Sequence, residues 1–135
     1  MKTLLITTFF IIIGIIQLVN AQERFRRDYN FVSVNSPSQS KNIFSEGRNV
    51  FVFNYGDNAD VLHVTSKGKS IVYIRTTPID RAKGNDGFYY SYFKALDQFG
   101  EPILIKVYDK EENGVMLFFK IEDDEEFTVF HFKNH

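Results

Sequence analysis

Apolar and polar side chains alternate along much of this 135-residue chain, and this period of two constrains the fold more than any other feature. In the segment 115–120, Val115, Leu117 and Phe119 share one face, because successive side chains of a β-strand point to opposite sides. Clusters of Gly, Asn, Asp and Pro interrupt the pattern before any run reaches helical length. The sequence therefore predicts an all-β fold with almost no helix.

The turn clusters divide the chain into seven predicted strands. These are residues 48–55, 60–66, 70–79, 88–96, 103–109, 115–122 and 127–132. Tyr29, Phe31 and Val34 indicate a further edge strand. Short strands without crossover helices favour antiparallel pairing. We predict an antiparallel β-sandwich of about seven or eight strands, with a single closed barrel as the alternative.

The composition narrows the class of protein. The chain has no cysteine, so a domain of this size depends on its apolar core rather than on disulfides. Fifteen Phe and seven Tyr are present, and all of them except Phe9 and Phe10 follow residue 21 and can supply that core. Sixteen basic and seventeen acidic residues leave a formal charge of −1, which lacks the basic field typical of nucleic-acid-binding proteins. We expect no nucleic-acid partner.

The first 21 residues resemble a cleaved signal peptide. Met1 and Lys2 precede an uncharged stretch at 4–19, and small residues precede the predicted cut between Ala21 and Gln22. A signal anchor is the alternative, because the stretch approaches the roughly 17 residues that span a thin bilayer. We expect cleavage, which predicts a secreted, extracellular protein without a membrane segment.

The basic motif at 24–27 follows the leader and resembles the R-x-R-R site of furin-like convertases. The sequence therefore predicts a cut after Arg27. A solvated basic arm is the alternative. Residues 33–47 are rich in Ser, Asn, Gln, Lys and Gly, which is typical of a loop. The predicted organisation is a signal peptide at 1–21, a flexible arm at 22–47 and a β-sandwich domain at 48–135. The predicted processing residues are Ala21, Gln22, Arg24, Arg26 and Arg27.

The longest predicted connection, residues 79–88, follows Pro78 and carries four charges and two glycines. Exposed connections of this kind often bind ligands, and a solvated loop without a ligand is the alternative. The aromatic run after it places Tyr90 and Tyr92 on one face, where they suit recognition of a protein, a sugar or a flat ligand, or pack in the core. The predicted binding surface consists of Asp80, Arg81, Lys83, Asp86, Tyr90 and Tyr92.

The histidines and acidic residues show no recognisable catalytic or metal-binding pattern. His63 and His131 are in phase with their strand neighbours, which indicates partly buried imidazoles rather than catalytic bases, and with His135 they match no zinc-site spacing. The acidic clusters at 109–112 and 122–126 offer oxygen ligands for calcium, but consecutive hairpins point to opposite ends. We expect no metal, no cofactor and no enzymatic activity, with a hidden glycosidase-type pair of carboxylates as the alternative.

Four motifs between residues 55 and 129 occur in an order shared with a known family. They are YGD at 55–57 followed by Val61 and Leu62, YFKALDQ at 92–98 with Gly100, VMLFFK at 115–120 and FTV at 127–129. Over roughly residues 47–132 the chain resembles the insect multiprotein bridging factor 2 proteins. It departs from them at 122–126, where acidic residues replace a Ser-Gln-Arg-Gly-like turn.

The resemblance implies a small, secreted, β-rich insect protein, and it carries no catalytic residues across. We therefore predict a secreted binding protein of insect type, from saliva, haemolymph or venom, that recognises a protein or small-molecule target at its surface. A lipocalin-like carrier of a small apolar ligand is one alternative, and it requires eight strands around an emptier interior. The other is the intracellular transcriptional coactivator that the family name implies, which requires an uncut leader.

Overall fold

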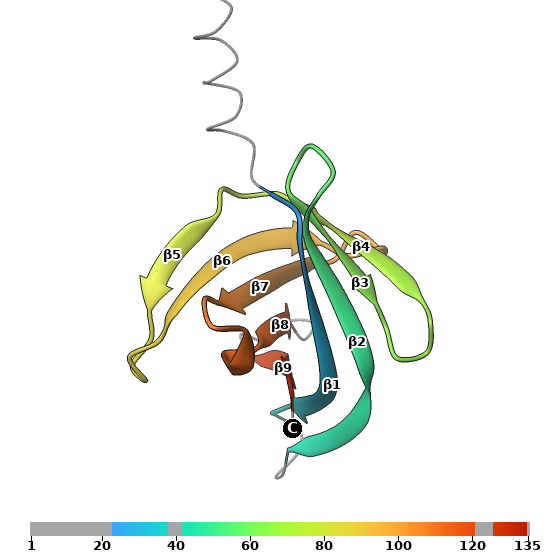
Figure 1. Cartoon of the computed structure of the whole chain (residues 1–135), viewed down its shortest axis with the longest axis vertical. Helices are drawn as coiled ribbons and strands as arrows, with labels where there is room; N and C mark the ends of the chain where they lie inside the picture. Colours follow the sequence, from blue (N-terminus) through green and yellow to red (C-terminus); the bar gives the residue numbers. More distant parts are fainter. Residues whose placement is uncertain (1–22, 38–41, 121–125, 135) are drawn as a thin grey trace, which may run out of the picture.

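The computed structural model describes residues 23–37, 42–120 and 126–134, and antiparallel strands make up most of them (Figure 1). The prediction of an all-β antiparallel fold is confirmed. No helix within the described ranges has the length and hydropathy of a membrane-crossing segment. The elements are β1 (Phe25–Asn35), β2 (Ile43–Tyr55), β3 (Asp60–Val64), β4 (Ser70–Arg75), β5 (Asp80–Lys83), β6 (Tyr89–Leu96), β7 (Pro102–Tyr108), the 3₁₀ helix η1 (Glu111–Asn113), β8 (Val115–Lys120) and β9 (Phe127–Lys133).

The seven predicted strands correspond to β2, β3, β4, β6, β7, β8 and β9, with ends that differ by a few residues. β4 ends at Arg75 rather than at 79, because Pro78 has no N–H to continue a ladder. The predicted loop at 79–88 contains β5, which pairs with β6 from Asp80 opposite Tyr92 to Lys83 opposite Tyr89. The prediction of an unstructured connection there is wrong over these four residues, because their backbone groups complete the edge of β6.

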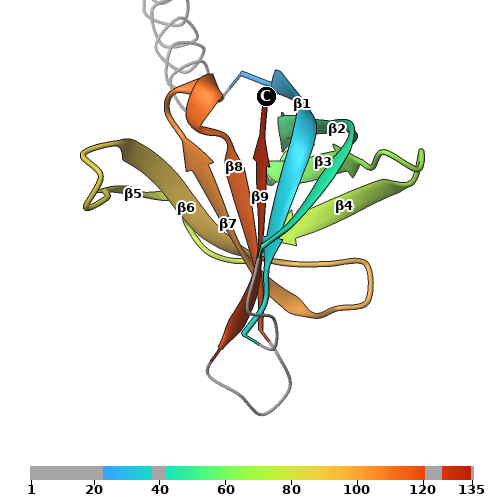
Figure 2. The ribbon, with the colours of Figure 1, turned by 90° about the horizontal axis from the view of Figure 1, so that it is seen from below.

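The strands close into a barrel. Their order is β4-β3-β2-β1-β9-β8-β7-β6-β5, and a further pairing of β4 with β6 closes eight of them. Figure 2 shows β1 beside β9, with β5 and β6 to one side and β3 and β4 to the other. The predicted sandwich is therefore wrong, and the closed barrel is correct. Alternation indicates which face of a strand is buried, but not whether the first and last strands of a sheet meet.

β1 joins the two halves of the barrel. It pairs with β2 from Phe25 opposite Phe53 onwards, and its second half also pairs with β9, with Val32 opposite Phe132. The strand indicated by Tyr29, Phe31 and Val34 is confirmed, although it pairs on both sides rather than lying at an edge. The prediction of a flexible arm at 22–47 is wrong over β1 and the start of β2. Polar composition does not prevent strand formation here, because the hydrogen bonds between strands join backbone groups. Polar side chains that lie at an edge or point to the outer face of the sheet meet water.

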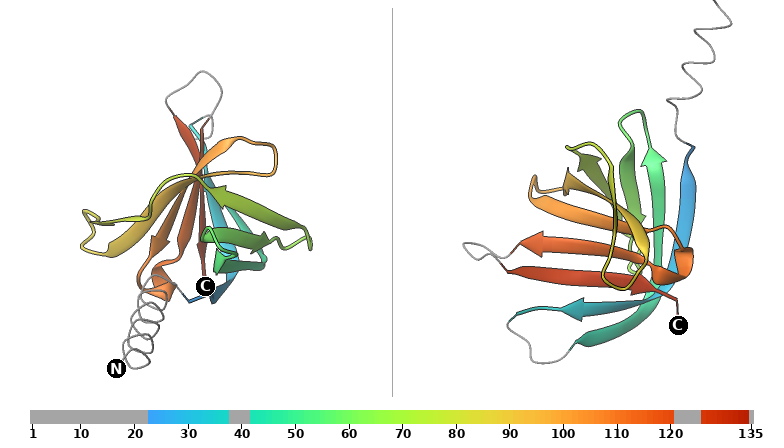
Figure 3. Two further views of the ribbon diagram at one scale, coloured as in Figure 1. Left: turned by 90° about the horizontal axis from the view of Figure 1, so that it is seen from above. Right: turned by 90° about the vertical axis from the view of Figure 1, so that its left-hand side faces the viewer.

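Large inward-facing side chains fill much of the barrel, and every one of the eight closing strands contributes at least one. The buried core residues are Tyr29, Phe51, Phe53, Val61, Tyr73, Phe93, Ala95, Ile103, Ile105, Val107, Val115, Leu117 and Phe132. This apolar burial stabilises a fold without disulfides. Because the chain runs up and down, η1, the start of β1, the β2–β3 turn and the end of β9 all lie at one end of the barrel, which we call the η1 end (Figure 3).

Candidate functional site

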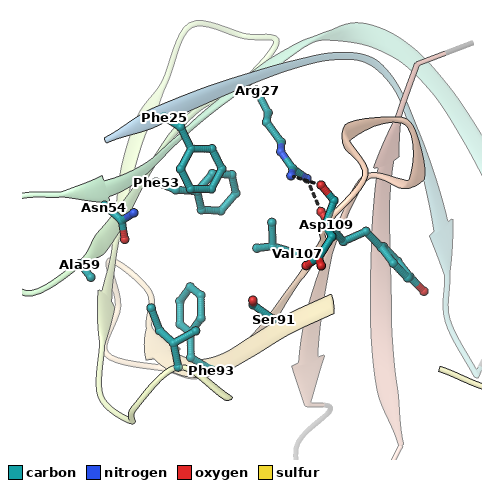
Figure 4. Close-up of a pocket in the computed structure, with 11 residues that line it drawn as sticks. Phe25, Arg27, Phe53, Asn54, Ala59, Ser91, Phe93, Val107 and Asp109 are labelled. Carbon is teal, nitrogen blue, oxygen red and sulfur yellow. Dashed lines mark hydrogen bonds between the residues drawn. The ribbon is translucent and has the colours of Figure 1, made fainter. Parts of the chain in front are cut away.

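A cavity of about 290 Å³ lies inside the η1 end of the barrel, and Figure 4 shows the side chains that surround it. β1, β2, β6 and β7 form its walls together with the β2–β3 turn and the β4–β5 connection. The lining residues are Phe25, Arg27, Phe53, Asn54, Ala59, Ile79, Ser91, Phe93, Val107, Tyr108 and Asp109. An eight-stranded barrel is just wide enough to be filled by side chains or to hold one small ligand. The space at this end suits the second case.

The path of β4 explains why the barrel is not filled here. β4 pairs with β6 at only two positions, Ile74 with Leu96 and Arg75 with Ala95. Beyond them, β5 takes the edge of β6 from Tyr89 to Tyr92. The connection between β4 and β5 crosses the resulting space, and its Ile79 lines the cavity. One wall of the cavity is therefore a connecting segment rather than a continuous sheet.

Side-chain hydrogen bonds hold this connection in place. The Arg75 guanidinium donates to the carbonyl oxygens of Asn58 at 2.9 Å and Thr77 at 2.6 Å. The Asn58 amide donates back to the Arg75 carbonyl oxygen at 3.1 Å. On the other side, the Thr77 hydroxyl oxygen accepts the Lys94 backbone N–H at 2.9 Å. The β2–β3 turn, the connection and β6 are thus tied together around the cavity.

Phenylalanine rings form the apolar part of the lining. Phe25 of β1 stacks on Phe53 of β2 with ring centroids 4.8 Å apart. Phe93 of β6 is buried in the same lining, whereas Phe25 is 41% exposed. Figure 4 shows these rings around an open centre. Flat apolar walls of this kind suit an aromatic or aliphatic ligand.

Arg27 places a positive charge in the same wall. Its side chain is only 9% exposed, and its guanidinium donates to the carbonyl oxygens of Tyr108 at 2.7 Å and Asp109 at 3.2 Å. A longer bond, 3.4 Å, reaches the Tyr29 hydroxyl oxygen. All three acceptors are uncharged. The Asp109 carboxylate, which also lines the cavity, instead pairs with Arg81.

A second polar group inside the barrel consists of Asn49, His63 and Tyr73. The Asn49 carboxamide oxygen lies 2.9 Å from His63 Nε2, and the Tyr73 hydroxyl lies 3.0 Å from Nδ1. Because the carboxamide oxygen can only accept, Nε2 carries the proton and Nδ1 accepts from Tyr73. Burial lowers the pKa of His63 to about 4 and raises that of Tyr73. The expectation of a buried imidazole on a sheet face is confirmed for His63.

The predicted binding surface lies on the β5–β6 hairpin but is divided between its two faces. Tyr90 and Tyr92 share one face, as predicted, with ring centroids 5.9 Å apart. Arg81 and Lys83 lie on the other face, over the ring of Tyr89. Asp80 lies opposite Tyr92 and so shares the face of the two tyrosines, whereas Asp86 lies in the turn before Phe88. Binding by these six residues stays a prediction.

The predicted processing residues differ in their surroundings. Ala21 and Gln22 lie outside the described residues. Arg24 precedes β1, and Arg26 is exposed and pairs with Asp28 at 2.7 Å. Arg27 is buried and lies opposite Phe51 in the β1–β2 ladder. A cut after Arg27 stays a prediction, and in the folded barrel it requires β1 to detach first.

The cavity residues were not identified from the sequence, although a signal exists. Phe25, Arg27 and Tyr29 alternate along β1, so one arginine occupies an inward position between aromatic residues. The resemblance of this basic motif to a convertase site obscured that pattern. Within the described ranges, no group of three His, Asp or Glu side chains is arranged to hold a metal ion, and residues 122–125 of the acidic cluster lie outside those ranges.

Comparison with family models, curated proteins and solved structures finds no match to this chain. The resemblance to the multiprotein bridging factor 2 family thus stays a prediction that depends on the four motifs. The site has to be interpreted from its own geometry. Its main features are the cavity, the phenylalanine walls and the buried guanidinium.

Proposed function

We propose that this protein binds a small, largely apolar ligand inside the η1 end of the barrel and acts as a carrier rather than as an enzyme. The observation that carries the proposal is the cavity of about 290 Å³ between Phe25, Phe53 and Phe93. Elsewhere the same barrel is filled by large side chains. Protein interiors are close-packed, so an open pocket between inward-facing rings, with polar groups in its wall, favours a binding site.

The volume limits the size of the ligand. Binding pockets for drug-sized ligands occupy about 300–1,000 Å³, so this cavity is at the lower end. An engineered cavity of about 150 Å³ holds benzene, and the present one is about twice as large. A ligand of about ten to fourteen non-hydrogen atoms therefore fits. Long-chain lipids exceed this size unless part of the chain lies outside the barrel.

A neutral aromatic probe tests the proposal. We expect 2-naphthol, followed by its fluorescence, to bind the purified protein at one site. Ser91→Phe directs a ring into the cavity and should weaken binding by about tenfold or more, because the probe loses apolar burial worth roughly 1.5–3 kcal/mol. Tyr90→Phe is the matched control, because Tyr90 is the neighbour of Ser91 and lies on the opposite face.

Circular dichroism and thermal unfolding establish that both variants fold. Equal binding by Ser91→Phe and the unmodified protein would contradict the proposal. So would the absence of 2-naphthol binding to the unmodified protein.

Recognition of a target at the outer surface is a second candidate function. It is favoured by a cluster on the outer face of β6 and β7, where the Lys106 ammonium lies 3.9 Å from the ring centroid of Tyr90 and 4.9 Å from that of Tyr108. Tyrosine rings are enriched in protein interfaces. If this cluster binds a partner, Tyr92→Ala weakens that binding and leaves 2-naphthol binding unchanged.

We also infer that the protein is secreted, on the basis of the leader at 1–21. The expected product in the medium of expressing cells begins at Gln22, or at Asp28 if a convertase also cuts, and intact-mass measurement distinguishes the two. A mass that includes Met1 would contradict secretion by signal cleavage. It would favour the intracellular coactivator implied by the family resemblance.

A further inference from the structure

Arg27 occupies a position where a charge is costly. It shares the inward face of β1 with Phe25 and Tyr29, because every second side chain of a strand faces the same side. Moving a charged group out of water is unfavourable unless an opposite charge or a full set of hydrogen bonds compensates it. An arginine in the wall of an apolar cavity therefore calls for an explanation.

The described residues supply hydrogen bonds to Arg27 but no opposite charge. Two backbone carbonyl oxygens and one phenol oxygen accept from its guanidinium, which has five N–H donors. Asp28, the next residue, pairs with Arg26 and Arg48, each at 2.7 Å. Asp109 pairs with Arg81. Across the described part of the chain, no carboxylate oxygen lies within 4.0 Å of the Arg27 guanidinium.

The guanidinium is also held in a defined orientation. Its bonds to Tyr108 and Asp109 fix it against the end of β7, and the side chain lies at the edge of the cavity in Figure 4. A fixed planar guanidinium binds a carboxylate with little further loss of side-chain entropy. Ser91 of β6 adds a hydroxyl group to the same lining. The apolar rings of Phe53 and Phe93 complete it.

From these contacts we propose that the cavity takes a small organic carboxylate, with its carboxylate group on Arg27 and its apolar body between Phe53 and Phe93. The inference rests on the proposed function and names the ligand class for it. One guanidinium suits a single negative charge. A phosphate monoester carries close to two, which one guanidinium balances only in part.

Decanoate and decan-1-ol test the inference on the unmodified protein. The two compounds have nearly the same apolar body and differ in charge at one end. We expect calorimetry at pH 7 to show decanoate binding about tenfold tighter or more, because a hydrogen-bonded charge pair replaces a weaker neutral contact. This comparison requires no substitution.

Two arginine variants test whether the preference for decanoate comes from Arg27. Arg27→Met keeps the length of the side chain and should bring decanoate to within about threefold of decan-1-ol, because the tenfold preference comes from the guanidinium. Arg26→Met removes the same charge from the outer face of the same strand and should keep the preference of the unmodified protein. If Arg27→Met does not fold, two other measurements test the inference. One is the preference for decanoate over decan-1-ol in Arg27→Lys, and the other is the same preference in the unmodified protein. Arg27→Lys should reduce the preference, because an ammonium cannot bind a carboxylate bidentately.

The outcomes separate the two proposals. Equal affinity for decanoate and decan-1-ol overturns the carboxylate inference and leaves the cavity as a binding site for neutral ligands. A preference for decanoate that persists in Arg27→Met overturns it as well. If neither decanoate, decan-1-ol nor 2-naphthol binds, the proposed function itself fails.

Discussion

Arg27, Asn49 and His63 are the polar residues buried in the described barrel, and each meets a different kind of partner. His63 is fully paired in its neutral form by Asn49 and Tyr73. Arg27 is charged and meets only neutral oxygens among the described residues. Polar groups that are satisfied internally stabilise a structure, whereas an uncompensated charge indicates a site for an opposite charge. This contrast is the reason why we propose Arg27, rather than His63, as a ligand-binding residue.

The protonation of His63 should make stability depend on pH. Its pKa is about 4 when folded and near 6.5 when unfolded, so the unfolded chain binds the proton more readily. The contribution of neutral His63 to the free energy of unfolding is fully present above pH 6.5 and is lost as the pH falls toward 4. Between pH 7.5 and 5.0 the free energy of unfolding should fall by about 2 kcal/mol from this residue. Urea unfolding at the two pH values measures the change.

Two histidine variants assign that effect. His63→Gln should lose most of the pH dependence between pH 7.5 and 5.0. His131→Gln should keep the part that comes from His63, although burial also lowers the pKa of His131. A His63→Gln variant with the same pH dependence as the unmodified protein would show that the buried imidazole does not titrate as described.

Gly114, just before β8, should not tolerate a side chain. Its φ of +88° is unfavourable for other residues, and a Cβ atom would lie 2.0 Å from the Phe132 carbonyl oxygen. Gly114→Ala should therefore lower the free energy of unfolding by about 3 kcal/mol or more. Gly100→Ala is the control, because its φ is +77° and its Cβ would meet nothing within 4 Å. That change should cost only about 1–2 kcal/mol, and equal losses in the two variants would refute the steric argument.

β1 and β5 show how an element depends on its neighbours. The sequence predicted a loop at β5, and at β1 a mostly flexible arm with one edge strand. In the structure β1 pairs with both β2 and β9, and β5 pairs with β6. In both cases the partner strand, rather than the local composition, provides the hydrogen-bonding groups. β1 also carries Phe25 and Arg27 into the cavity.

Limited trypsin digestion should report the pairing of β1. We expect a rapid cut after Arg24, which precedes the strand, and a slow cut after Arg27, which is buried and paired. A cut inside a strand requires local opening, so dilute urea should accelerate the second cut more than the first. Mass spectrometry of the products distinguishes them. Equal rates in the absence of urea would mean that the start of β1 is open in solution.

The closure of the barrel controls both its stability and its cavity. Two register pairs between β4 and β6 complete the ring, and the space beyond them is the candidate ligand site. A ligand in this space contacts strands that are distant in the sequence, such as β1 and β7. Binding should therefore stabilise the whole folded state, because the unfolded chain has no such cavity.

Decanoate should raise the unfolding temperature. At one hundred times its dissociation constant, it should increase the free energy of unfolding by about 2.7 kcal/mol, which corresponds to an increase of about 10 °C for a domain of this size. Differential scanning calorimetry measures the shift. The Arg27→Met variant should show a smaller shift at the same concentration. If calorimetry detects binding but the unfolding temperature does not change, decanoate binds the unfolded chain as tightly as the folded barrel, which contradicts a site formed by the barrel.

The sequence by itself determined the all-β antiparallel class, the approximate positions of seven strands and the inward set on strands such as β8. Alternation and turn residues act over a few neighbouring positions, so these features are local. The sequence indicated only an edge strand around residues 29–34, and it did not determine that β1 joins the two halves of the sheet or that the sheet closes. Those features depend on contacts such as Ile74 with Leu96 and Arg27 with the Tyr108 carbonyl oxygen, 81 residues away. The cavity follows from the same long-range contacts. Only the tertiary structure could reveal it, since a space is defined by all its walls together.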